Sequence, residues 1–487
     1  MKNLNEEKNE IDLKKENNHN FAKSINNKYS QINSIGKIQS EIYKNKNTTA
    51  SKISIAMQDP IKYSEILQAS SYVMNYNSGI LKEFLIYKSE ILTYDHFILP
   101  IDINKYKTAE ELDKAEYKAC TQLEKYKIKF NVGWMTKKIM SQGSLYICET
   151  EDNESISIQE IPPSFCRAIG NKNSVMKYGI DLSKINDKNK DYFPAEIQAL
   201  YEKFKKGLLK NDDNLFDNSF YILQNRAYCF NVDYMLEKGI PYYSHLFLDL
   251  INLEEMKNLD VANAKTENFK IIAQKVPTDD SGDLLIEADD AILYHEALKR
   301  ELPENVGAVT SPLDINNIAL GDNTAKKIDY NNKLKEAIYD GAGISTEIFN
   351  GNKSTNEAIA LGAVADTLLP LHILKMIEIW LNEDFKTSSK TKNWKISFLD
   401  TSHYNKSKKI GEATSAISTY FGKKQYLATL GMTPLETYNT LKYEELSKIG
   451  EKMLPLMTSH TMSSSDIGRP INEDNLDSVT NTGESIN

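Results

Sequence analysis

The chain has 487 residues, of which 40% are hydrophobic and 26% charged, and its formal net charge is -9. This length and composition predict a real core divided among several structural modules. The negative charge argues against tight phosphate binding over a broad surface. Sequence-specific contacts to base edges are also disfavoured, because arginine occurs only at Arg167, Arg226, Arg300 and Arg469.

The four cysteines are neither paired at C-x-x-C spacing nor accompanied by histidines at metal-ligand spacing: Cys120, Cys148, Cys166 and Cys229. We expect them to be buried free thiols. The sequence has no unbroken apolar run of about 18 residues and no signal-peptide core near its start. A soluble protein made in a cytoplasm, without a membrane partner, is therefore expected.

Both ends of the sequence are polar. Residues 1–52 are mostly Asn, Lys, Glu and Ser with isolated apolar residues, so they cannot bury enough surface to offset the entropy of ordering. They are predicted to form a mobile arm. Residues 463–487 are predicted to form a disordered tail, made acidic by Glu473, Asp474, Asp477 and Glu484.

The first half of the chain mixes helical and strand patterns. Apolar residues spaced by three and four predict helices over 60–92 and 109–126. Alternation predicts a pair of strands, 144–150 and 155–161, closed by Pro162 and Pro163. A helix over 196–208 and a buried segment over 219–232 follow.

The second half has an unusual order of elements. A long helix over 243–265 is followed by a small module, consisting of strand 269–276, helix 289–302 and strand 306–310. Helical pattern resumes over 324–339 and ends at a Gly-Ala-Gly sequence. A polar loop then leads into a helix of about thirty residues, 356–385, with an apolar stripe from Leu361 to Leu381. Strand 394–399 and helices within 406–449 complete the ordered part.

This order of elements resembles the portal proteins of tailed bacteriophages. Local sequences are also similar to portals from phages of low-GC Gram-positive bacteria, namely Gln142 to Tyr146, Ile158 to Arg167, Thr310 to Pro312, Ala342 to Gly351, Gly422 to Pro434 and Gly468 to Pro470. The resemblance covers about residues 55–475. It implies an α+β, mainly helical portal fold with wing, stem, clip and crown modules around long helices.

The resemblance also divides the chain into named modules. The boundaries that the resemblance implies are 1–52 for the arm, 53–240 for the wing, 241–266 for stem helix 1, 267–322 for the clip, 323–341 for stem helix 2, 342–356 for the tunnel loop, 357–405 for the spine helix and a wing strand, 406–462 for the crown and 463–487 for the tail. The N-terminal arm is longer than the family pattern requires.

Two groups of residues are candidates for lining a DNA channel. The tunnel-loop candidates have small polar side chains suited to sliding along DNA: Asn350, Gly351, Asn352, Lys353, Ser354 and Thr355. The stem candidates are Lys326, Lys327, Lys333 and Lys335, although a simple solvated helix face balanced by nearby carboxylates is the slightly favoured alternative. Because they lie on successive turns, these lysines cannot all face one way.

The clip is rich in carboxylates, which the resemblance implies form a docking surface: Asp283, Glu287, Asp289, Asp290 and Glu296. Acids are stabilised at a helix N-terminus without any catalytic use. Lys353-Ser354 is similar to the end of a phosphate-binding P-loop, but the required glycine before the lysine is absent. No catalytic residue, metal site or cofactor is expected.

The resemblance implies a non-enzymatic ring, dodecameric in the family, at one capsid vertex of the virion, assembled in the host cytoplasm. It implies a channel for DNA packaging and ejection in which double-stranded DNA passes without sequence recognition. The partners implied are other copies of the chain, terminase, the major capsid and scaffold proteins and a head-tail adaptor. Two alternatives stay open: a DNA-processing enzyme such as a terminase subunit, and another structural virion protein such as an adaptor or minor head protein.

Overall fold

The computed structural model describes residues 49–151, 155–210, 212–223, 226–234, 236–267, 270–279, 281, 283–303, 306–313, 330–345, 348–349, 356–419 and 422–449. Helices make up 56% and strands 18% of these residues. A mixed α and β fold that is mainly helical is therefore confirmed. Contacts divide the chain into two units, 1–435 and 436–487, and most of the last helix, α16 (Pro434–Ser447), belongs to the second.

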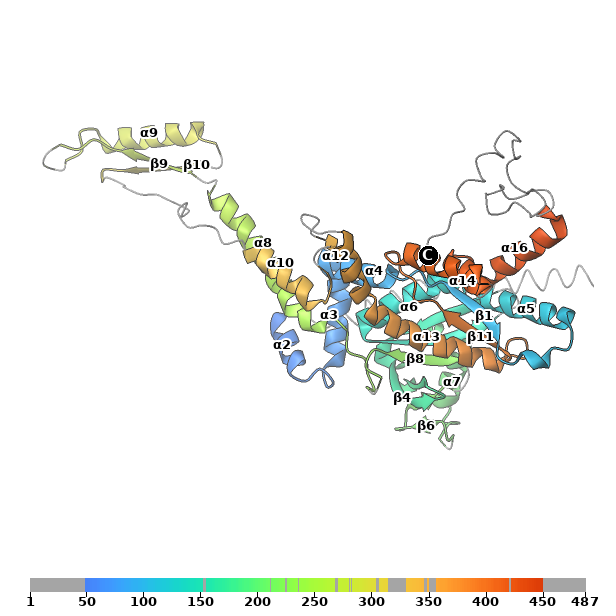
Figure 1. Cartoon of the computed structure of the whole chain (residues 1–487). Coiled ribbons are helices and arrows are strands. Elements are labelled where there is room, and N and C mark those ends of the chain that lie inside the picture. The colour runs from blue at the N-terminus through green and yellow to red at the C-terminus, as the bar shows by residue number, and fades with distance from the viewer. Residues whose placement is uncertain are drawn as a thin grey trace, which may run out of the picture. The chain divides into compact units, whose positions relative to one another are not determined.

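A seven-stranded sheet forms the core of the first unit (Figure 1). The expected strand pair is confirmed, since β2 (Ser144–Glu151) and β3 (Ile156–Ile161) lie antiparallel. The remaining strands are β4 (Cys166–Lys172), β5 (Val175–Asp181), β6 (Leu215–Phe216), β7 (Phe220–Ile222) and β8 (Ala227–Asn231). Helix α7 (Ala195–Lys205) places Ile197 and Leu200 in the core of this sheet. The four cysteines are buried and unpaired, as predicted.

In the described part of the chain, five α-helices precede the sheet, and the last of them packs on β2. They are α2 (Ala50–Gln58), α3 (Ser64–Asn77), α4 (Gly79–Glu90), α5 (Ala109–Glu124) and α6 (Ile128–Gln142). The prediction of a single helix over 60–92 is wrong, because α3 ends at Asn77 and α4 begins at Gly79, with Ser78 between them. The Ser78 hydroxyl accepts a hydrogen bond from the backbone N–H of Leu81 (3.4 Å), so it caps a new helix instead of continuing the first.

A second sheet has two antiparallel strands, β1 (His96–Pro100) and β11 (Trp394–Phe398). Next to it lie α13 (Leu368–Thr387), α14 (Lys406–Ser418) and α15 (Lys423–Thr429). The buried carboxylate of Asp95 connects these elements, because it binds Lys129 (2.9 Å) and Lys406 (3.4 Å). This charge cluster thus joins the residue before β1 to the first turns of α6 and α14.

Two glycines allow a close approach of backbone at the start of β2. Gly143 has a φ of 77°, and a Cβ on Gly239 would lie 2.3 Å from the Gly143 carbonyl carbon. Gln68 fixes the same place, since its side-chain amide donates to the Gly239 carbonyl (2.8 Å). No side chain larger than hydrogen fits at position 239 without moving backbone.

Gly239→Ala is therefore expected to destabilise the first unit by about 1–3 kcal/mol, the usual cost of overpacking. Thermal unfolding followed by circular dichroism measures the effect. Gly170→Ala is the matched control, because no atom lies within 4 Å of a Cβ at that exposed position. Equal melting temperatures for the two variants would show that the backbones do not meet as described.

Candidate functional site

Helices α8 (Phe247–Glu267) and α10 (Tyr330–Gly341) lie side by side (Figure 1). Asn331 of α10 donates a hydrogen bond to Asp260 of α8, and the His245 ring lies 3.0 Å from the Gly341 carbonyl. At the base of the pair, the Tyr339 ring meets the Phe84 ring edge-on, with centroids 5.0 Å apart. The helices predicted over 243–265 and 324–339 are present where the structure describes them.

Between these two helices in the sequence lies a small βαβ module. Strands β9 (Lys270–Lys275) and β10 (Val306–Ser311) are parallel, and helix α9 (Ala288–Glu301) crosses between them and contacts β10 (Figure 1). Strand, helix and strand were all predicted within two residues of these bounds. The Asp279 carboxylate shapes the turn before α9, because it accepts from the backbone N–H groups of Ser281 and Asp283 (both 2.9 Å).

The five predicted docking carboxylates of this module are all exposed: Asp283, Glu287, Asp289, Asp290 and Glu296. Asp289 and Asp290 lie in the first turn of α9, where the helix dipole favours negative charge. Among the described residues, no group of three or more His, Cys, Asp or Glu side chains is arranged to hold a metal ion. The arrangement suits a charged contact surface better than an acid-base centre.

The structure describes two of the predicted channel lysines. Lys333 and Lys335 are both exposed on α10, but residues two apart point to nearly opposite sides of a helix. Lys335 lies beside α8 and extends over the Tyr339 ring, 6.0 Å from its centroid. Lys326 and Lys327 lie outside the described residues, as do all six tunnel-loop candidates, Asn350 to Thr355.

A buried ion pair holds the start of the loop segment, the residues 342–355 that follow α10. Lys88 of α4 binds Asp366 at the end of α12 (Asn356–Asp366), with 2.9 Å between Nζ and Oδ1. The two side chains are 5% and 2% exposed. The other Asp366 oxygen accepts from the Tyr87 hydroxyl (2.9 Å) and from the backbone N–H of Ser345 (3.3 Å). We refer to Tyr87, Lys88, Ser345 and Asp366 as the joint.

Pro370 explains why the ion pair is at this position. Proline has no N–H, so it cannot donate to the carbonyl of Asp366, four residues earlier in the helix. Lys88 Nζ satisfies that carbonyl instead (3.0 Å) and also donates to the Gly343 carbonyl (3.2 Å). The helix predicted over 356–385 is therefore present but not continuous, because one turn residue, Thr367, divides it into α12 and α13.

Burial dominates the electrostatics of the joint. It lowers the pKa of Lys88, although hydrogen bonding and attraction to Asp366 oppose that shift. Burial, together with the hydrogen bond to Asp366, raises the pKa of Tyr87 well above its usual range. Packing is tight as well, since a Cβ on Gly362 would lie 2.4 Å from the Ser345 hydroxyl oxygen. The joint fixes the end of α10, the start of the loop segment and the end of α12 on α4.

A second buried cluster was not predicted from the sequence. The Asp384 carboxylate on α13 accepts from the hydroxyls of Tyr228 (2.8 Å) and Tyr126, and Arg226 lies 3.8 Å away. Glu149 of β2 is buried nearby, 3.7 Å from Arg226. Burial and the neighbouring Asp384 raise the pKa of Glu149 well above its ordinary value. Both buried clusters could have been suspected from the sequence, because Lys88, Asp366 and Asp384 are charged residues inside largely apolar helical segments.

By length and composition alone, one described helical stretch, Ile359–Thr387, could cross a membrane, with a mean hydropathy of 1.5. Core helices of soluble proteins meet the same criterion. The stretch is not an unbroken apolar run, because it contains Asp366, His372 and Lys375. Its second half packs on the sheets, where Ile377, Trp380 and Leu381 are buried.

Comparison with known proteins adds no assignment, since no protein-family model and no curated protein matches this sequence.

Proposed function

We propose that this chain is a subunit of a phage portal, a ring at one capsid vertex through which DNA is packaged and ejected. The observation that carries the proposal is the βαβ module inserted between the packed helices α8 and α10, followed by the joint and the long helix α12–α13. In the proposed portal, α8 and α10 are the stem, the module is the clip and α12–α13 is the spine. The loop segment between α10 and α12 is the tunnel loop.

Simple geometry is consistent with a DNA channel. Helices are about 10 Å across, so twelve of them side by side have a circumference of roughly 120 Å and leave a bore of about 25–30 Å. That bore admits a duplex. The subunit's charge of -9 and its few arginines suit a wall along which DNA moves without being held.

Each proposed element has a physical task. The exposed carboxylates of α9 and its preceding turn give terminase, and later the head-tail adaptor, a charged surface to contact. The joint holds the base of the tunnel loop to α4, so a force on the loop passes into the body of the subunit. Capsid and scaffold proteins contact the outside of the ring. In this proposal the chain itself catalyses no reaction, because terminase, the packaging motor, supplies the energy that moves the DNA.

Removing the stem lysines should weaken DNA retention. Replacing Lys326, Lys327, Lys333 and Lys335 together with Gln is expected to lower the fraction of packaged DNA that is retained, because each lysine near a phosphate contributes to an attraction that salt screens. Retained DNA per head, measured at low and high salt, reports the change. Unchanged packaging and retention would show that these lysines do not line the channel.

The assembly state tests the proposal itself. Mass photometry of the purified full-length protein is expected to show a particle of about 660 kDa, twelve copies of the 55.4 kDa chain. A neighbouring copy number that also closes a ring would support the proposal equally. A monomer that stays monomeric when scaffold protein is added contradicts it, and ATP hydrolysis by the purified chain would favour a DNA-processing enzyme.

A further inference from the structure

The helix α12–α13 carries an apolar stripe that the described chain leaves exposed. Leu361, Val364 and Leu368 are 74%, 49% and 68% exposed, and their spacing of three and four places them on one face. Contiguous exposed apolar surface of this kind marks an interaction site. The same face continues through the exposed residues His372 and Lys375, which add a basic end to the stripe.

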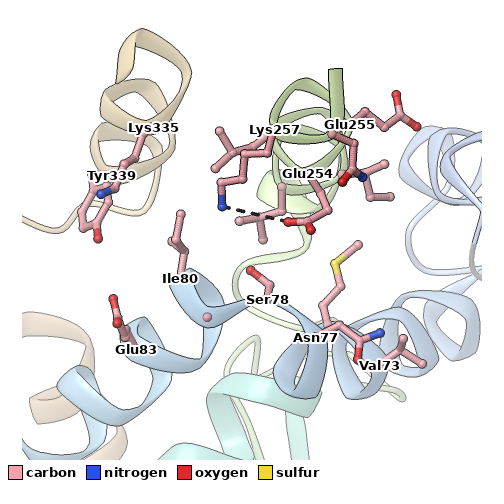
Figure 2. A pocket seen from close by; sticks show the side chains of 16 residues that line it. Val73, Asn77, Ser78, Ile80, Glu83, Glu254, Glu255, Lys257, Lys335 and Tyr339 are labelled. Carbon is pink, nitrogen blue, oxygen red and sulfur yellow. Dashed lines mark ion pairs between the residues drawn. The ribbon is translucent and has the colours of Figure 1, made fainter. Parts of the chain in front are cut away.

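A groove lined by apolar side chains, which could receive this stripe, lies elsewhere on the same chain. It has a volume of about 720 Å³ and is bounded by the turn between α3 and α4, by α8 and by α10. Its apolar lining includes Val73 of α3 and Ile80 of α4 (Figure 2), with Ile251 and Leu253 of α8. An apolar ridge on a helix can insert between helices that present such a hollow.

The charges around the groove also match the stripe. Three carboxylates lie at its edge, Glu83, Glu254 and Glu255, together with two lysines, Lys257 and Lys335 (Figure 2). Lys257 lies 4.0 Å from Glu254. The exposed apolar part of the stripe carries no carboxylate, and its extension carries Lys375. A stripe seated in the groove therefore buries apolar side chains beside an edge that carries more carboxylates than lysines.

A stripe and a groove on different elements of one chain make a head-to-tail contact. Each copy offers its stripe to one neighbour and its groove to the other, and a contact of this type closes into a ring when the rotation permits. We propose that the stripe Leu361, Val364 and Leu368 of one copy occupies the groove between α3–α4, α8 and α10 of the next copy. This inference rests on the proposed ring and specifies the two surfaces that build it.

Two double variants test the stripe and the groove independently. The stripe variant, Leu361→Glu with Leu368→Glu, places charges on exposed positions, so the fold should be retained. The groove variant, Ile80→Glu with Ile251→Glu, places charges on half-buried side chains that line the groove. The control is Leu208→Glu, which changes an equally exposed leucine, 69% exposed, on another element. Circular dichroism spectra and melting temperatures establish that each variant is folded.

The expected result is that the control forms rings whereas each double variant alone is monomeric. When the two double variants are mixed, the intact stripe of one fits the intact groove of the other. The mixture should therefore give dimers that stop there, because the remaining stripe and groove are both disrupted. Mass photometry resolves monomer, dimer and ring in one measurement.

Other outcomes overturn the inference in distinguishable ways. If the wild-type chain is monomeric even when scaffold protein is added, the proposed ring, and with it the portal proposal, is contradicted. Rings formed by the stripe variant leave the portal proposal intact and show that the stripe is not in the interface. Absence of dimers in the mixture shows that the stripe has a partner other than this groove. If the wild type floats with phosphatidylcholine vesicles and the stripe variant does not, the stripe meets a membrane instead of a second copy.

Discussion

Replacing Lys88 with Met is expected to lower the free energy of unfolding by about 3–5 kcal/mol, the cost of leaving a buried charge without its partner. Asp366 would keep the Tyr87 hydroxyl and the Ser345 N–H, but its negative charge would be uncompensated at 2% exposure. The Asp366 carbonyl would also lose the donor that substitutes for the N–H missing at Pro370. Urea unfolding followed by tryptophan fluorescence measures the loss, since Trp380 and Trp394 are buried in the same unit.

Lys82→Met is the matched control, because Lys82 lies on the same helix and is exposed. Its unfolding midpoint should stay close to that of the wild type. The double variant Lys88→Met with Asp366→Asn should recover part of the loss, because neither side chain then carries a charge. A midpoint for Lys88→Met equal to that of Lys82→Met would contradict the buried ion pair.

Replacing Glu149 with Gln is expected to remove a large part of the pH dependence of stability. Because the folded-state pKa of Glu149 is raised, its stabilising contribution is fully present below the unfolded pKa and is lost as the pH rises through the folded pKa. Between these two pKa values the wild type should lose up to about 1.4 kcal/mol of unfolding free energy per pH unit from this group. Gln has nearly the same shape and no charge, so the variant should be more stable than the wild type at pH 8.

The measurement is a series of urea unfolding curves from pH 4.5 to pH 8.5. The wild-type and Glu149→Gln curves should nearly coincide at the acid end and separate as the pH rises. Glu110→Gln, a change at an exposed position in the first turn of α5, should follow the wild type throughout. A Glu149→Gln variant that becomes less stable than the wild type above pH 7 would show that the carboxylate is ionised in the folded protein.

Element order was predictable where a simple periodicity was strong. Alternation located the strands at 144–150 and 155–161, and the change from strand to helix to strand located the βαβ module. Breaks within helices were missed because they depend on single residues. Ser78 starts a new helix by capping it, and Pro370 removes one backbone donor from a stretch whose apolar spacing continues.

Site geometry was less predictable, because it depends on pairs far apart in the chain. Lys88 and Asp366 are 278 residues apart, so neither sequence context indicates a partner. Periodicity also placed Leu361, Leu368, Leu374 and Leu381 on one stripe but could not say what covers it. The structure buries Leu374 and Leu381 and leaves Leu361 and Leu368 exposed. An apolar pattern alone does not separate a core contact from a contact with another molecule.

The proposed portal function is tested most directly by electron microscopy of the purified full-length protein, with top-view class averages. The expected particles are rings of about a dozen subunits around an open axial hole wide enough for a DNA duplex, roughly 25–30 Å by helix geometry. Rings without an axial opening, or particles that are not annular in the presence of scaffold protein, would contradict it.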